Sequence, residues 1–189
     1  MVVDNFLSPR ALELLRRFAL DAAVWHSAKV GGYLGAYIYD GFTPQSLHDI
    51  ATEMEEAFPR AFDQGRHSLN MAWAYKYDSS LQRGIKLHVD EAAVNANFWL
   101  TENDNEASTG KKAGDWGVDG GNDPHEFDHD LGGMVVFRQE PPLGTPRERY
   151  NNEGMDHGAK RRELDSSGYG SVNVKHRANR LVLFKSNLW

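Results

Sequence analysis

Short runs of β-branched and aromatic residues recur from Ser68 onward, and they limit the folds that this chain can adopt. Stretches rich in Gly, Pro, Asn and Asp separate the runs, and these residues favour turns. The pattern predicts strands at 69–77, 85–90, 93–100, 133–138, 172–175 and 180–184. Short strands that follow helices favour an antiparallel sandwich braced by those helices.

Two helices are predicted before the strands. Ser8 and Pro9 suit an N-cap and a first helical position, and Thr43 and Pro44 repeat that arrangement. Apolar residues then recur at helical spacing, at Leu12, Leu15, Phe18, Ala19 and Ala22 in the first helix and at Leu47, Ile50, Ala51, Met54, Ala57 and Phe58 in the second, which Pro59 ends. The expected fold class is therefore α+β and mainly β, with N-terminal helices bracing the strands.

Composition narrows the class of protein. At 189 residues, the chain is expected to form a single domain over residues 1–189. A net charge of −6 without a basic stripe argues against nucleic acid as a partner. The absence of Cys excludes disulfides, thiolate zinc sites and cysteine nucleophiles. With neither a long apolar stretch nor a signal-like N-terminus, we expect no membrane association and a soluble, cytoplasmic protein.

The pair His88 and Asp90 carries the chemistry that the sequence suggests. Residues two apart on an extended strand point to the same face. An imidazole and a carboxylate on one face supply two of the three ligands in the 2-His-1-carboxylate set that holds non-haem Fe(II). Tyr77 on the preceding predicted strand and Asn97 and Trp99 on the following one alternate toward this face.

Four segments together resemble a known family. They are 2–8, 84–100 with its His88-Val89-Asp90 motif, 132–137 and 179–186. In content and order they resemble the Fe(II)/2-oxoglutarate-dependent dioxygenases of the prolyl-hydroxylase-like kind, over nearly the whole chain. The resemblance implies a double-stranded β-helix, or jelly roll, with His88 and Asp90 as iron ligands. It also implies Fe(II) as cofactor, 2-oxoglutarate as cosubstrate, and hydroxylation of an unidentified small-molecule or peptide substrate.

By the same resemblance, Tyr75, Tyr77, Asn97 and Trp99 would border the 2-oxoglutarate pocket. The alternative for these residues is that they fill the barrel core. Lys86, two positions before His88, could pair an anionic cosubstrate, although a charge at a strand end more often reaches water.

The sequence departs from the family pattern at its end. In the family, the strand equivalent to 180–184 is followed by the second iron-binding His and then by an Arg or Lys that pairs the distal carboxylate of 2-oxoglutarate. The resemblance implies that both groups, with the last core strand, would lie beyond Trp189, either because the sequence is a fragment of a longer gene product or because this member has lost the chemistry. In both cases we expect weak or absent iron binding in the chain as given. His157 and His176 are the candidates for a substitute ligand, but their spacing does not favour either.

Three other interpretations stay open. The chain could be a metal-free jelly-roll binding or scaffold module in which His88 and Asp90 form an ordinary hydrogen-bonded pair. A cupin-like isomerase or lyase is disfavoured, because cupins gather several His within one short strand segment. The acidic stretch 101–130, with His125 and His129, is either a second metal site or a solvated loop.

Overall fold

Two N-terminal helices and a set of short antiparallel strands form the chain, as seen in a computed structural model that describes residues 1–29, 33–77, 85, 87–101, 133–146, 151, 155–186 and 188. The fold is α+β and mainly β, as predicted. Within the described residues the strands are β1 (Val2–Asp4), β2 (Ser27–Lys29), β3 (Tyr33–Tyr37), β4 (Trp73–Tyr77), β5 (Val94–Phe98), β6 (Met134–Phe137), β7 (Ser171–Val174) and β8 (Arg180–Lys185). The helices are α1 (Pro9–Asp21), α2 (Gln45–Ala57) and α3 (His157–Ser166).

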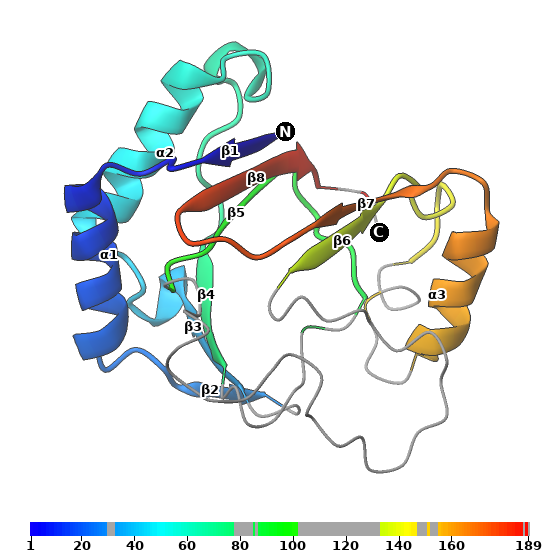
Figure 1. Ribbon diagram of the computed structural model, residues 1–189, viewed down its shortest axis with the longest axis horizontal. Helices are drawn as coiled ribbons and strands as arrows, with labels where there is room; N and C mark the ends of the chain where they lie inside the picture. Colours follow the sequence, from blue (N-terminus) through cyan, green and yellow to red (C-terminus); the bar gives the residue numbers. More distant parts are fainter. Residues whose placement is uncertain are drawn as a thin grey trace.

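The strands form three small sheets, with orders β1-β8-β5, β2-β3-β4 and β6-β7, and every recorded pairing is antiparallel. In Figure 1, α1 and α2 lie together on one side of the strands, and α3 lies on the opposite side beside β6 and β7. None of the helices in the described part of the chain is long and apolar enough to cross a bilayer.

Both N-terminal helices form where the sequence predicts them. The Ser8 hydroxyl accepts a hydrogen bond from the Ala11 N–H at 3.2 Å, which caps the first turn of α1 and confirms the predicted start. The N-cap predicted at Thr43 is wrong by one residue. Pro44 takes the extended N-cap conformation instead, and its carbonyl accepts the Leu47 N–H at 2.9 Å, so α2 begins at Gln45 without a side-chain cap.

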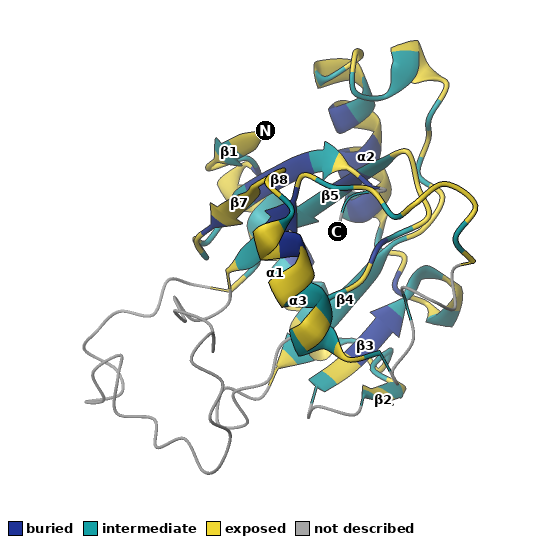
Figure 2. Cartoon of the chain, turned by 90° about the vertical axis from the view of Figure 1, so that its right-hand side faces the viewer, coloured by how far each residue is buried: buried dark blue, intermediate teal, exposed yellow. Residues whose placement is uncertain are grey.

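The main core lies between β8 and the two N-terminal helices. Leu181 of β8 is fully buried, and Leu15 of α1 and Ile50 of α2 pack in the same cluster. Figure 2 shows the buried residues on β3, β8 and α2, with exposed residues on the outer turns of α1 and α3. Ala96 and Phe98 of β5 face this cluster. Because side chains alternate along a strand, Asn95 and Asn97 of β5 project from the opposite face of the sheet.

Two further clusters complete the interior. Ala36, Phe42 and Leu47 join β3 to α2, and Val89, Phe137 and Leu164 join the 88–90 segment to β6 and α3. The second of these clusters places the segment that carries His88 and Asp90 against α3.

The strand predictions succeed unevenly. The runs at 93–100, 133–138, 172–175 and 180–184 each contain a strand, whereas in 69–77 only the last five residues form a strand, β4. The strand predicted at 85–90 is wrong for residues 85 and 87–90, which belong to no strand, and Lys86 lies outside the described residues. The sequence pattern did not predict β1, β2, β3 or α3.

Candidate functional site

His88 and Asp90 lie side by side at the surface. His88 Nε2 is 3.7 Å from Asp90 Oδ1, and their side chains are 42% and 23% exposed, respectively. The two side chains are therefore close together, as expected from their spacing, but the strand from which that expectation came is absent at residues 88–90. Their atoms face each other across a gap that solvent can reach.

Asp90 is held by two polar residues from the β5–β8 sheet. The Asn95 side-chain Nδ2 donates to Asp90 Oδ2 at 2.6 Å, and the Ser186 hydroxyl donates to the Asp90 carbonyl at 3.2 Å. Both partners are buried, Asn95 at the start of β5 and Ser186 directly after β8. Because Asn95 engages Oδ2, the other carboxylate oxygen is the one directed at His88.

Val89, between His88 and Asp90, anchors these residues through packing and through hydrogen bonds to its backbone. Its side chain is buried with Phe137 and Leu164. Its N–H donates to Asn151 Oδ1 at 2.8 Å, and its carbonyl accepts a hydrogen bond from Asn151 Nδ2. One side-chain amide thus gives Val89 the pair of hydrogen bonds that a neighbouring strand would supply.

Tyr75 and Tyr77 lie in a different sheet, where they form an aromatic cluster on one face of β2-β3-β4. Tyr33 stacks on Tyr77 at a ring-centroid distance of 5.1 Å and meets Tyr75 edge-on at 5.3 Å, and Tyr37 meets Tyr75 at 6.4 Å. The Lys29 ammonium lies 5.0 Å from the centre of the Tyr37 ring. Ala36, which alternates with these residues, packs on the helix side, so the tyrosines occupy the opposite face of the sheet.

Burial and hydrogen bonding set the protonation of this cluster. Burial raises the pKa of Tyr75 and also that of Tyr77, although the Tyr77 residue as a whole is 47% exposed. Like other tyrosines at neutral pH, both keep a hydroxyl that can donate hydrogen bonds. Burial opposes ionisation of Tyr37 too, but hydrogen bonds from Lys29 and Tyr75 outweigh it and lower the pKa of Tyr37. The hydrogen bond to Tyr37 raises the pKa of Lys29. Gly35 leaves room for the rings, since a Cβ there would lie 3.2 Å from Tyr37 and 3.3 Å from Tyr75.

Asn97 lies on the same face of β5 as Asn95, and Trp99 comes directly after the end of the strand. The Asn97 side-chain Nδ2 lies 3.9 Å from the Met134 sulfur, and the Trp99 ring meets the His176 ring edge-on at 5.8 Å. His176 Nε2 is also 3.1 Å from the Thr101 hydroxyl. The structure therefore places these residues at different points along the strand, with Asn95, which the sequence analysis did not select, in contact with Asp90.

The donor set fits part of a metal site. Nitrogen and oxygen donors bind divalent ions such as Zn²⁺ at about 2.0–2.2 Å, so two donors on adjacent octahedral positions lie about 3 Å apart. The 3.7 Å gap between His88 Nε2 and Asp90 Oδ1 would need to close by about 0.7 Å, a small side-chain rotation. Among the described residues, no group of three His, Asp, Glu or Cys residues is placed to hold a metal. The stretch with His125 and His129 lies outside those residues.

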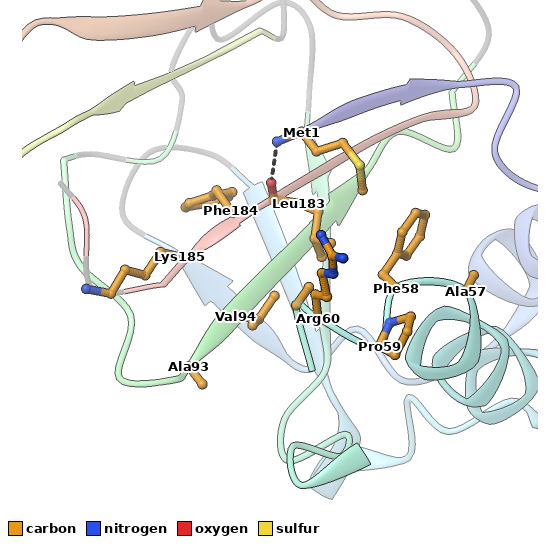
Figure 3. Close-up of a pocket in the computed structure, with 11 residues that line it drawn as sticks. Met1, Ala57, Phe58, Pro59, Arg60, Ala93, Val94, Leu183, Phe184 and Lys185 are labelled. Atoms are coloured by element: carbon orange, nitrogen blue, oxygen red, sulfur yellow. Dashed lines mark hydrogen bonds between the residues drawn. The ribbon is translucent and has the colours of Figure 1, made fainter. Parts of the chain in front are cut away.

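An apolar hollow of about 610 Å³ lies between the end of α2 and the β5–β8 edge. Figure 3 shows Phe58 and Pro59 on one side of it and Val94 and Leu183 on the other, with the Met1 amino group donating to the Leu183 carbonyl at 2.7 Å. Val94 alternates with Asn95 along β5, so this hollow opens on the opposite face of the sheet from the contact with Asp90. It is separate from the candidate site.

The residues that sequence reasoning missed are the ones that hold the pair: Asn95, Asn151 and Ser186. Asn95 could have been found, because it shares the strand face already predicted for Asn97. Asn151 and Ser186 carry no local signal, since their contacts span 62 and 96 residues of sequence, respectively.

Comparisons with known proteins add no relative: no family model matches the sequence, and no curated protein and no solved structure matches the chain.

Proposed function

We propose that this chain is an Fe(II)- and 2-oxoglutarate-dependent oxygenase domain with a double-stranded β-helix fold, which hydroxylates a small-molecule or peptide substrate. The observation that supports the proposal is the contact between His88 Nε2 and Asp90 Oδ1 at 3.7 Å, in a pair that solvent can reach. An imidazole and a carboxylate are two of the three ligands in the facial triad of such enzymes. The resemblance in the order of sequence segments supports the same conclusion.

Each residue has a defined task in this proposal. His88 would supply the imidazole nitrogen and Asp90 the carboxylate oxygen to hold an iron. Asn95 keeps Asp90 Oδ2 occupied and so leaves Oδ1 as the oxygen that would be available to the metal. When iron and 2-oxoglutarate are bound, they supply the oxidising chemistry, in which one oxygen atom of O₂ enters the substrate C–H bond and the other enters succinate as CO₂ is released.

The tyrosine cluster is the candidate cosubstrate wall. Tyr75 and Tyr77 are protonated at neutral pH, as tyrosines ordinarily are, so their hydroxyls are available to donate hydrogen bonds to a carboxylate of 2-oxoglutarate. Asn97 and Trp99 are proposed to border the same pocket from β5. A second function, a metal-free binding module, is favoured by the stacked rings of Tyr33 and Tyr77, which offer a rigid aromatic surface on β2-β3-β4.

The deciding experiment is an anaerobic Fe(II) titration in the presence of 2-oxoglutarate, on the protein with all residues that its gene encodes. We expect the weak visible charge-transfer band of an Fe(II)–2-oxoglutarate complex, and its loss in His88→Ala and in Asp90→Ala. His48→Ala and Asp49→Ala are the matched controls, because both residues are exposed on α2, far in the sequence from the pair. The controls should retain the band.

Circular dichroism of each variant establishes that it is folded. A folded wild-type protein without the band would refute the oxygenase and favour the binding module. A band that persists in both His88→Ala and Asp90→Ala would show that iron binds elsewhere and would refute the assignment of these two ligands.

A further inference from the structure

Asn151 makes an unusual contact for a residue in a polar stretch. Its Oδ1 accepts the Val89 N–H at 2.8 Å, and its Nδ2 donates to the Val89 carbonyl. Val89 is the residue between His88 and Asp90, and it is 3% exposed. A single side chain therefore satisfies both backbone groups of the residue that links the two candidate ligands.

These hydrogen bonds act on the two peptide groups that flank Val89. The Val89 N–H belongs to the peptide that joins it to His88, and the Val89 carbonyl belongs to the peptide that joins it to Asp90. Each peptide is planar, so fixing one polar group of each restricts the rotation that would swing the His88 or Asp90 Cα–Cβ bond away. The Val89 side chain, packed against Phe137 and Leu164, resists rotation of the whole segment.

We propose that Asn151 is a positioning residue, which holds His88 and Asp90 in the orientation needed to bind one divalent cation. The inference rests on the proposed function for the identity of the site, and it adds a residue that acts without touching the metal. Asn95 orients the carboxylate of Asp90 directly. Asn151 orients the backbone that carries both ligands.

The chain contains a matched control for this contact. The Asn179 side-chain amide accepts the Leu7 N–H and donates to the Leu7 carbonyl, each at 2.8 Å. That contact has the same chemistry but joins the start of α1 to the turn before β8. Asn179→Ala therefore loses an equivalent pair of hydrogen bonds without altering the backbone between His88 and Asp90.

The test uses the protein with all residues that its gene encodes, and measures the Mn²⁺ affinity of the wild type, Asn151→Ala and Asn179→Ala by electron paramagnetic resonance of the free ion. Loss of residues that orient metal ligands commonly weakens metal binding by about 10- to 100-fold, and we expect that range for Asn151→Ala. The affinity of Asn179→Ala should stay within about twofold of the wild type. Asn151→Asp keeps the acceptor for the Val89 N–H and loses the donor, so its Mn²⁺ affinity should fall between those of the wild type and Asn151→Ala. Asn151→Asp replaces Asn151→Ala in the test if the alanine variant does not fold.

Amide hydrogen exchange provides a readout that needs no metal. Asn151→Ala should accelerate exchange at Val89 and leave Leu7 unchanged, and Asn179→Ala should do the reverse. If the wild type binds Mn²⁺ and both Asn151 variants bind it equally well, the positioning role is overturned while the proposed function stands. If the wild type binds no Mn²⁺, the metal site and the role of Asn151 in it are both overturned.

Discussion

Asn179 provides the sharpest test of how side-chain amides hold this fold together. Its φ is +57°, in the left-handed region that most residues avoid, and its amide pairs with both backbone groups of the buried Leu7. Its own N–H donates to the Trp99 carbonyl at 2.9 Å. The residue therefore joins the start of α1 to the turn between β7 and β8.

The cost of Asn179→Ala can be worked out from these contacts. Two intramolecular hydrogen bonds contribute about 1 kcal/mol each, so their loss removes about 2 kcal/mol. Alanine in the left-handed conformation adds at least about 1 kcal/mol, which brings the expected loss in the free energy of unfolding to about 3 kcal/mol. Asn179→Gly should lose up to about 0.5 kcal/mol less, because glycine avoids the Cβ penalty of about 1 kcal/mol but gives up roughly 0.5–1 kcal/mol of extra freedom on folding.

Urea denaturation followed by circular dichroism measures both variants. With a slope of about 2 kcal/mol per molar urea, a loss of 3 kcal/mol lowers the midpoint by about 1.5 M at an unchanged slope. A loss below about 0.5 kcal/mol in Asn179→Ala would show that water replaces the amide without cost. A glycine variant less stable than the alanine variant would refute the argument from the left-handed backbone.

Three further predictions concern the hydrophobic core, the stability of the protein at low pH and the first helix. Leu164→Ala, at a side chain that is 1% exposed and packs with Val89, should reduce the free energy of unfolding by about 2–5 kcal/mol in urea titration, and a loss under 1 kcal/mol would contradict the packing of α3. The hydrogen bond from Arg180 lowers the pKa of Asp4 below its ordinary value of 3.8. The stability that this carboxylate contributes is therefore fully present above pH 3.8, and it is lost as the pH falls through the lower pKa of the folded state. Asp4→Asn should therefore be less stable than the wild type at neutral pH, with a difference that shrinks in acid; a difference independent of pH would refute the linkage. Ser8→Ala should lower the free energy of unfolding by about 1 kcal/mol through loss of the α1 cap, and an unchanged urea midpoint would show that the cap is not needed.

Local pattern predicted the elements whose own residues determine them. The start of α1 follows from Ser8 and Pro9, and the stripe of α2 follows from apolar spacing that the structure buries at Ile50 and Met54. The helix α3 was missed because it buries a single residue, Leu164, and its remaining side chains give no apolar stripe. Such a helix is fixed by tertiary packing and by its capping Asp156, which accepts the Ala159 N–H, and neither is apparent from hydrophobic periodicity.

The candidate site shows the same division between local and distant causes. The structure brings the side chains of His88 and Asp90 together, with 3.7 Å between Nε2 and Oδ1, as their two-residue spacing led us to expect, although residues 88–90 form no strand. The same spacing predicted a strand that is absent at residues 88–90. There the side chain of Asn151 makes the hydrogen bonds to Val89 that a neighbouring strand would otherwise make. A contact that spans 62 residues leaves no periodic trace in the sequence.

The pair is therefore assembled by two separate parts of the fold. The β5–β8 sheet contributes Asn95 and Ser186, which hold the carboxylate and the backbone of Asp90. The cluster between β6 and α3 contributes the packing of Val89, and Asn151 supplies its hydrogen bonds. Since the first part holds the carboxylate of Asp90 and the second holds both peptide groups between the two ligands, loosening either one should misalign the donor atoms before the protein unfolds. Metal affinity should therefore respond to the contact between these two parts more strongly than global stability does. Variants of Asn151 should lose metal affinity, whereas variants of Asn179 should lose stability and keep their metal affinity.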